Sequence, residues 1–216
     1  MKFSFSKDVF LPAHHTRGGV RVAHEKHTAG CPTQELPVPA CVTIPMQQHI
    51  GAPCIPCVKK GDWVAVGQII GDSDSFVSAP IHASVSGTVV RIEEVTAQKG
   101  GVSYNIVIKN DGKNTLADSV VPFGKKLSDA SPDEIIAAVR AAGIIGMGSA
   151  AFPTYAKLAA VRGKADTLIV NCIESEPFLC ADHRLVLENP AAMIHGLKII
   201  MVALGIRQTC CGQPEG

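Results

Sequence analysis

A glycine-rich loop is the first stretch of this chain whose residue types could hold a ligand. It reads GIIGMGSAAFPT over 143–154 and lies between two predicted helices. Glycines let backbone N–H groups come close to a phosphate, and the N-terminus of the following helix adds a favourable dipole. The loop matches neither a dinucleotide-binding fingerprint nor a Walker motif, and a plain helix connection explains its glycines equally well. Both interpretations stay open at this point.

Two glutamates follow the loop at a position where α/β proteins bind ligands. The apolar run 167–171 predicts a buried strand, and the segment NCIESEP (171–177) lies at its carboxyl end. Open α/β sheets bind ligands beyond that end of their strands. Glu174 and Glu176 are therefore candidate site residues, while a place in an exposed loop is the commoner role of glutamate.

Two cysteines, Cys54 and Cys57, form the motif CIPC. Such a pair could be half of a zinc site or a redox couple. A zinc site needs two further ligands at a matching spacing, and the nearest other cysteine is Cys41. A redox motif opens a helix after a strand, whereas this one lies among short predicted strands. We favour two structural thiols in a β-rich module over a thiol- or metal-dependent protein.

The first 40 residues predict an irregular, solvated arm rather than a metal site. They contain four prolines and a Gly-Gly pair, which do not favour regular elements. They also contain four histidines whose spacing fits no common ligand pattern. These histidines are His14, His15, His24 and His27.

The composition excludes several classes of protein. Lys and Arg total 20 against 19 Asp and Glu, and this net charge of +1 argues against a nucleic-acid-binding protein. A hydrophobic content of 46% with 18% charged residues is typical of a globular chain. We find no run of about 20 apolar residues and no secretory signal, so we predict a cytosolic chain or one held at a membrane by partners. The eight cysteines are then expected to be reduced.

Hydrophobic patterning divides the chain into an arm (1–40), a β module (41–127) and the beginning of an α/β domain (128–216). Short, closely spaced strands in the β module predict a small barrel or sandwich. They are expected at 42–44, near Val58, and at 63–64, 68–70, 76–77, 88–92 and 104–109, with a turn at 110–112.

Three helices are expected in the last segment. SPDE at 131–134 is a capping box with proline at the first helical position, and Gly143 ends that helix. The second covers 155–161. The third begins at 189–190, ends at Gly205 and carries one apolar stripe. The stripe consists of Ile194, Leu197, Met201 and Leu204.

The β module resembles the biotinyl and lipoyl domains. GDWVAVGQ (61–68) and ASVSGTV (83–89) match that family's strands and turn glycines. A carrier domain also needs a lysine at the tip of the hairpin between these segments. Residues 71–80 contain none, so we do not expect a carrier function.

A second resemblance is more specific. GIIGMGSAAFPTYAK (143–157), with NCIESEP (171–177) and ADHR (181–184), resembles the flavin- and NADH-binding subunit of respiratory complex I. The chain is more similar still to the RnfC family, the C subunits of Rnf ion-translocating electron-transport complexes. Further matching segments cover nearly the whole chain: GGV (18–20), ELPVP (35–39), IPMQQHIGAP (44–53) and VSAPIHASVSGTV (77–89).

The resemblance implies an α+β fold, with a small lipoyl-like β barrel or sandwich followed by an incomplete α/β flavin-binding domain. In this family the glycine loop cradles the phosphate of FMN. That role falls on Gly146, Gly148 and Ser149, with Lys157 as the nearby cation. Electrons enter from NADH as a hydride to FMN and leave singly through iron–sulfur clusters.

The resemblance also assigns the residues after the predicted strand. Asn171 would approach the flavin. Glu174 and Glu176 would line the flavin and nicotinamide pocket and are the candidate catalytic residues.

Three residues depart from the family pattern. Ser149 stands where a second glycine is common, Ile173 replaces an aspartate of the complex I pattern, and Arg21 stands where a histidine often occurs. The family also carries two 4Fe-4S clusters in a later ferredoxin-like segment, and its CxxCxxC runs do not occur in this sequence. We therefore assign no metal ligands to this chain.

The resemblance implies that this chain is part of a peripheral subunit on the cytoplasmic face of the membrane. It would pass electrons between NADH and ferredoxin, coupled to ion translocation, with the other Rnf subunits as partners and without nucleic acid. Because only one strand is clear after residue 128, we expect a truncated chain or a tail shifted out of frame. Such a chain would bind FMN weakly or not at all and would be inactive alone. The alternatives are a non-catalytic lipoyl-like interaction module or a remnant without activity.

Overall fold

Residues 23, 25–97, 100–148, 150–172, 174 and 176–212 are described in the computed structural model. They fall into two units, Leu36–Val161 and the combination of Met1–Glu35 with Arg162–Gly216. The sequence-based boundaries at residues 40 and 127 stay a prediction.

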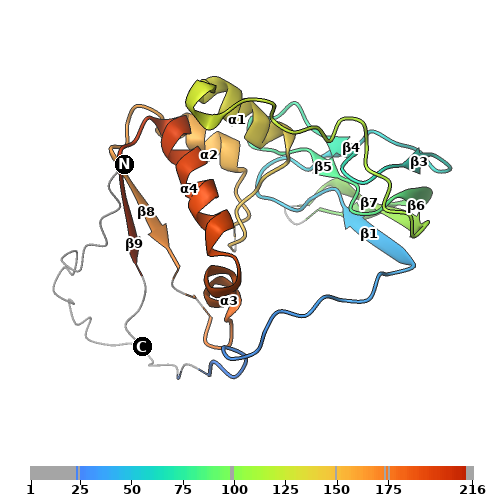
Figure 1. The fold of residues 1–216 in the computed structure, drawn as a ribbon. Coiled ribbons are helices and arrows are strands. Elements are labelled where there is room, and N and C mark those ends of the chain that lie inside the picture. The colour runs from blue at the N-terminus through green and yellow to red at the C-terminus, as the bar shows by residue number, and fades with distance from the viewer. Residues whose placement is uncertain are drawn as a thin grey trace. The chain divides into compact units, whose positions relative to one another are not determined.

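The two long antiparallel strands β6 (Gly87–Thr96) and β7 (Val102–Asn110) are the centre of the unit Leu36–Val161 (Figure 1). A bulge between Val89 and Arg91 shifts their register, and a bulge increases local twist. Across the first sheet the strands are β1 (Cys41–Pro45), β7 (Val102–Asn110), β6 (Gly87–Thr96) and β3 (Trp63–Val64). Across the second they are β2 (Ile55–Pro56), β4 (Ile69–Asp72) and β5 (Ile81–His82).

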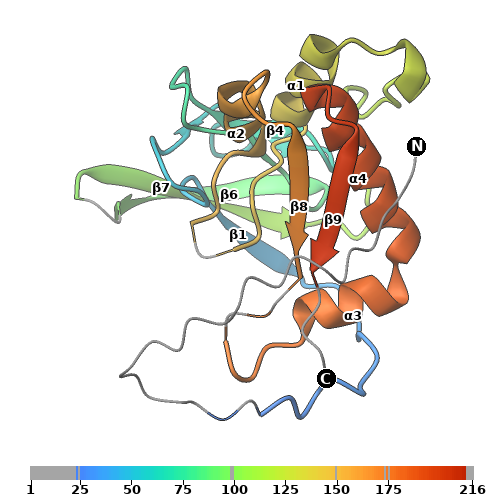
Figure 2. The ribbon, with the colours of Figure 1, turned by 90° about the vertical axis from the view of Figure 1, so that its left-hand side faces the viewer.

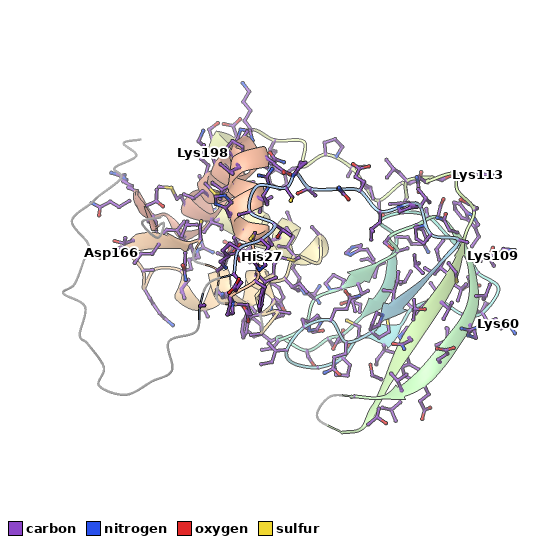
Figure 3. The ribbon with its side chains drawn as sticks, turned by 90° about the horizontal axis from the view of Figure 1, so that it is seen from below. His27, Lys60, Lys109, Lys113, Asp166 and Lys198 are labelled. Atoms are coloured by element: carbon purple, nitrogen blue, oxygen red, sulfur yellow. The ribbon has the colours of Figure 1, made fainter. Side chains whose placement is uncertain are left out.

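Apolar side chains from both sheets form one core. Met46, Ile70 and Ile106 are fully buried in it. Charged residues lie outside, and the exposed Lys60, Lys109 and Lys113 are seen at the edge of the β module (Figure 3). The expected small barrel or sandwich therefore has the apolar interior that it needs.

Most strands of this unit are confirmed, and the differences concern the shortest ones. Strands cover the expected 42–44, 63–64, 88–92 and 104–109, and β4 covers 69–72 where 68–70 was expected. No strand forms at Val58 or at 76–77, and the two-residue strands β2 and β5 were not expected. Pairs this short show no hydrophobic alternation, so patterning cannot detect them.

The helices of this unit begin and end where the sequence indicates. α1 (Pro132–Ala141) follows the short 3-10 helix η1 (Leu127–Asp129) and has a complete capping box. The Glu134 N–H donates to Ser131 Oγ over 3.3 Å, and Glu134 Oε2 accepts from the Ser131 N–H over 2.9 Å. Gly143 follows α1 with a φ of +64°, and α2 covers Thr154–Val161.

The other unit contains a two-stranded parallel sheet and two helices. β8 (Thr167–Asn171) pairs with β9 (Gln208–Gly212), and Figure 2 shows the two strands side by side. α3 (Ala181–Glu188) and α4 (Pro190–Leu204) lie between them in the chain. α4 was expected, and Gly205 ends it with a φ of +70°.

Three expectations about this unit were wrong. β9 is a second strand where only one was expected, and α3 was not expected at all. Strand 167–171 forms, but it is not buried, and Ile169 is 68% exposed. The physical reason is that β9 is its only strand partner among the residues described. In the α4 stripe, Ile194 is also 39% exposed.

No single helix among the described residues is long and apolar enough to span a membrane. α3 and α4 taken together pass the same test of length and composition, but their axes bend by 97° at the break.

Candidate functional site

The glycine-rich loop closes on itself between α1 and α2. The Gly146 N–H donates to the Phe152 carbonyl over 2.9 Å, and the Thr154 N–H donates to the Ile144 carbonyl over 3.0 Å. These bonds bring the start of α2 back beside the end of α1. The N-terminus of α2 and the glycines therefore belong to one small structure, as a phosphate-binding loop requires.

Gly143 serves the fold itself. It adopts a φ of +64°, a left-handed conformation that favours glycine. A Cβ atom there would lie 2.4 Å from the Pro80 carbonyl oxygen and 3.0 Å from the His82 ring. The end of α1 can therefore pack on β5 only with glycine at this position.

Gly146 and Gly148 differ from Gly143, because nothing in the described part of the structure requires them to be glycine. Neither has a positive φ. A Cβ on Gly146 would make ordinary contacts at 3.6 Å with Phe152, and one on Gly148 would meet nothing within 4 Å. Met147 between them is 97% exposed. The two glycines thus leave an open stretch of backbone that a ligand can approach.

Lys157 lies on α2, close in sequence to the loop, and its side chain is exposed. It forms no ion pair with any residue of the described ranges. Its ammonium group is therefore available to an anion. Ser149, the third loop residue assigned to FMN, lies outside the described residues.

A bracket of side chains holds the loop and α2 against the hairpin of the β module. The Arg140 guanidinium donates to the Ser73 carbonyl over 3.3 Å and lies 5.6 Å from the centre of the Tyr155 ring. Asp72 lies 3.5 Å from the same guanidinium. The Tyr155 hydroxyl donates to the Phe76 carbonyl, and the two rings meet edge to face at 5.8 Å. The bracket fixes α2, which carries Lys157.

The second group of predicted site residues belongs to the other unit. Asn171 is the last residue of β8 and is exposed. Glu174 is half-buried, and its Oε1 accepts from the N–H groups of Asp182 at 2.8 Å and His183 at 3.2 Å. A carboxylate at this place caps α3 and interacts favourably with the helix dipole.

Glu176 is exposed, two residues after Glu174. Its carbonyl oxygen accepts a hydrogen bond from Lys26 Nζ over 2.9 Å. The structure therefore brings Glu174 and Glu176 together in one unit with Asn171. Gly146, Gly148 and Lys157 belong to the other unit. Two of the residues that depart from the family pattern, Arg21 and Ile173, lie outside the described residues. The same holds for the histidines His14, His15 and His24.

A buried polar cluster was missed by the sequence reasoning. His49 is 5% exposed, and its Nε2 accepts from the Ala79 N–H over 3.1 Å. Since Nε2 accepts, the ring proton lies on Nδ1, which is 3.2 Å from the Ile50 carbonyl. Ser78 and Cys54 lie against the same nitrogen, with Oγ at 3.4 Å and Sγ at 3.8 Å. In the sequence His49 follows two glutamines, and nothing in that pattern signals its burial.

The geometry of the CIPC motif disfavours a redox couple. Cys54 is 2% exposed and donates to the Ala79 carbonyl over 3.1 Å, whereas Cys57 is exposed. Burial raises the pKa of the Cys54 thiol, although the Ser78 hydrogen bond opposes it. Reactive cysteines have lowered pKa values. Among the described residues, no group of three or more His, Cys, Asp or Glu side chains could hold a metal ion.

A cavity of about 120 Å³ lies where α1 meets the β module. Its lining residues are Gln48, His49, Pro80, Ile81, His82, Gly143 and Ile145. Pockets for cofactor-sized ligands usually measure about 300–1,000 Å³. This cavity is therefore too small for a flavin.

Comparison with known proteins gives two matching families. The family described as "RnfC Barrel sandwich hybrid domain" matches residues 14–113, and the "Nuo51 FMN-binding domain" matches residues 139–213. The expected α+β fold, a β barrel-sandwich module followed by a flavin-binding domain, is confirmed.

Three relatives have names of one kind, and each is the C subunit of its complex. That of the Na(+)-translocating ferredoxin:NAD(+) oxidoreductase complex of Acetobacterium woodii is 41% identical over 91% of this chain and 44% of its own length. That of the proton-translocating ferredoxin:NAD(+) oxidoreductase complex of Clostridium ljungdahlii is 43% identical over 91% of this chain and 43% of its own length. That of the ion-translocating oxidoreductase complex of Rhodobacter capsulatus is 40% identical over 89% of this chain and 37% of its own length.

The resemblance carried by the glycine loop and the β-module motifs is thereby confirmed, over less than half the length of these relatives. Over about nine tenths of its length the chain is therefore similar to RnfC proteins, the C subunits of ion-translocating oxidoreductase complexes.

Proposed function

We propose that this chain supplies the β module and part of the FMN-binding domain of an electron-transfer subunit. The subunit passes electrons between NADH and ferredoxin through FMN and 4Fe-4S clusters, and this transfer is coupled to ion translocation. The names of the relatives and the FMN-binding domain family support the proposal. The other Rnf subunits are the partners, and the subunit is peripheral on the cytoplasmic face of the membrane.

The observation that carries the proposal is the contrast among the loop glycines. The fold explains Gly143, but it explains neither Gly146 nor Gly148. A glycine that the fold does not require is accounted for by close approach of a ligand to the backbone. The exposed ammonium of Lys157, which has no ion pair within the described ranges, favours an anionic ligand. The phosphate of FMN satisfies both conditions.

The chain's own residues would bind and orient the cofactor. The Gly146 N–H already bonds to the Phe152 carbonyl, so Gly146 would contribute by leaving space beside the phosphate. Backbone N–H groups at Gly148 and Ser149 would donate to the phosphate, and Lys157 would neutralise its charge. When bound, FMN converts the two-electron chemistry of NADH into single-electron transfers.

On the other unit, Asn171 would contact the flavin, and Glu174 and Glu176 would line the nicotinamide side. Because Glu174 already caps α3, its carboxylate would act from a fixed position.

A phosphate-specific binding measurement tests this assignment. The 216-residue chain is titrated with FMN and with riboflavin, which lacks the phosphate, while flavin fluorescence is recorded. We expect FMN to bind more tightly than riboflavin. Lys157→Met should weaken FMN about tenfold or more, the effect of losing one charged hydrogen bond, and leave riboflavin unchanged.

Two further variants complete the measurement. Gly148→Ala should weaken FMN without lowering stability, because its Cβ meets only open space. Lys164→Met removes another exposed lysine, outside the loop, and should change neither affinity. Equal affinities of the wild-type chain for FMN and riboflavin would contradict the phosphate assignment.

A further inference from the structure

A short N-terminal segment lies along the turn that carries Glu176, about 150 residues away in sequence. Lys26 Nζ donates to the carbonyl oxygens of Glu176 at 2.9 Å and Leu179 at 2.6 Å. The Glu25 N–H donates to the Pro177 carbonyl over 3.1 Å. One ammonium group thus joins the first and last carbonyls of the four-residue turn 176–179.

The same segment is also attached to α3. The Arg184 guanidinium donates to the Ala29 carbonyl over 3.2 Å, and the Thr33 N–H donates to Glu188 Oε1 over 2.9 Å. Hydrogen bonds from Arg184, and then from Thr33, lower the pKa of Glu188 to about 2. Residues 25–33, which include the labelled His27 (Figure 3), therefore form a strap across the turn and the helix.

The turn 176–179 connects Glu174 to the start of α3, the helix that Glu174 caps. On one side, the Glu174 carboxylate caps the first N–H groups of α3. On the other, α3 begins directly after Cys180, whose own side chain provides no cap. For Glu174 to reach back to α3, residues 176–179 must stay folded into a turn. Lys26 holds the two ends of that turn together.

We propose that Lys26 is a positioning residue that fixes the acidic segment carrying Glu174 and Glu176. It acts through two backbone carbonyls and does not itself touch a substrate. The proposal rests on the proposed function only in giving that segment a role in the cofactor pocket. The positioning itself concerns contacts within one unit of the chain.

Amide hydrogen exchange of the 216-residue chain, followed by NMR without any flavin, tests this positioning. The informative amides are those of Asp182 and His183, which donate to the Glu174 carboxylate, and of Glu25, which donates to Pro177. In Lys26→Met we expect these amides to exchange about tenfold faster or more, because two charged hydrogen bonds are lost. Lys26→Arg keeps a charged donor and should restore most of the protection.

The controls separate positioning from general stability. Lys164→Met removes an exposed lysine of the same unit and should leave the three amides unchanged. The Ile206 N–H, bonded to the Met201 carbonyl, reports on α4 and should also keep its wild-type rate.

Unchanged exchange at Asp182 and His183 in Lys26→Met would overturn the proposal. Equal acceleration at Ile206 would overturn it too, since Lys26 would then support the whole unit. Because no flavin is present, failure of FMN binding would leave this result as it stands.

Discussion

Replacing Gly143 with alanine should destabilise the unit Leu36–Val161 far more than the same change at Gly148. Gly143 has a φ of +64°, and this left-handed conformation costs about 1–2 kcal/mol for a residue with a Cβ. The new Cβ would also lie 2.4 Å from the Pro80 carbonyl oxygen and 3.0 Å from two atoms of the His82 ring. A ring can move, but the Pro80 carbonyl can move only with the backbone that leads directly into β5.

The two contributions to the expected loss of stability are separate. Forcing an extra methyl group into a packed site costs about 1–3 kcal/mol. Together with the backbone strain, we expect Gly143→Ala to lower the free energy of unfolding by about 2–5 kcal/mol. For Gly148→Ala we expect a change within about 0.5 kcal/mol, because the Cβ meets nothing and φ is not positive.

The chain contains a natural probe for this measurement. Its single tryptophan, Trp63, lies on β3 in the same unit and donates to Asp111 over 3.1 Å. Urea unfolding followed by Trp63 fluorescence gives the free energy of unfolding for each variant. A loss below about 1 kcal/mol in Gly143→Ala, or equal losses in both variants, would refute the distinction between the two glycines.

Two further predictions concern the elements that hold the loop. Hydrogen bonds from Lys125, and then from Ser131, lower the pKa of Glu134 from its ordinary 4.5 to about 2. The ionised Glu134 carboxylate therefore stabilises the fold above pH 4.5, and this stabilisation is lost as the pH falls toward 2. Glu134→Gln should therefore lose less stability than the wild-type chain over that range, and superimposable thermal melts of the two would contradict this. Tyr155→Phe removes the hydrogen bond to the Phe76 carbonyl and keeps the ring contact, so a loss of about 1 kcal/mol in urea unfolding is expected, and no loss would show that the bracket does not depend on this bond.

The predictable parts of the fold are those whose signals are local. The capping box at 131–134 and the closing glycines Gly143 and Gly205 define the ends of helices within a few residues. The long strand 104–109 shows its pattern over enough residues to be recognised. The glycine loop and Glu174 could likewise be selected as candidates from residue type and spacing alone.

The missed parts depend on partners that are distant in the chain. The residue before α3, Cys180, does not cap it, and the cap comes from Glu174, which lies before the intervening turn. β9 is polar over 208–209 and is a strand because it pairs with β8. The burial of His49 depends on contacts with Ser78 and Ala79, about 30 residues away. None of these contacts leaves a periodic signal in the sequence.

The bracket also weighs against the rival interpretation of the β module as a carrier. A lipoyl-like carrier must present the tip of its hairpin freely, with a lysine on it. Here the stretch 71–80 has no lysine, and two of its backbone carbonyls accept hydrogen bonds from the helices. The Ser73 carbonyl accepts from Arg140, and the Phe76 carbonyl accepts from Tyr155. The hairpin that a carrier would swing between partners is fixed to the two helices that frame the glycine loop. The β module therefore serves as the support of the loop, and Gly146, Gly148 and Lys157 remain the residues that we propose to bind the ligand in this unit.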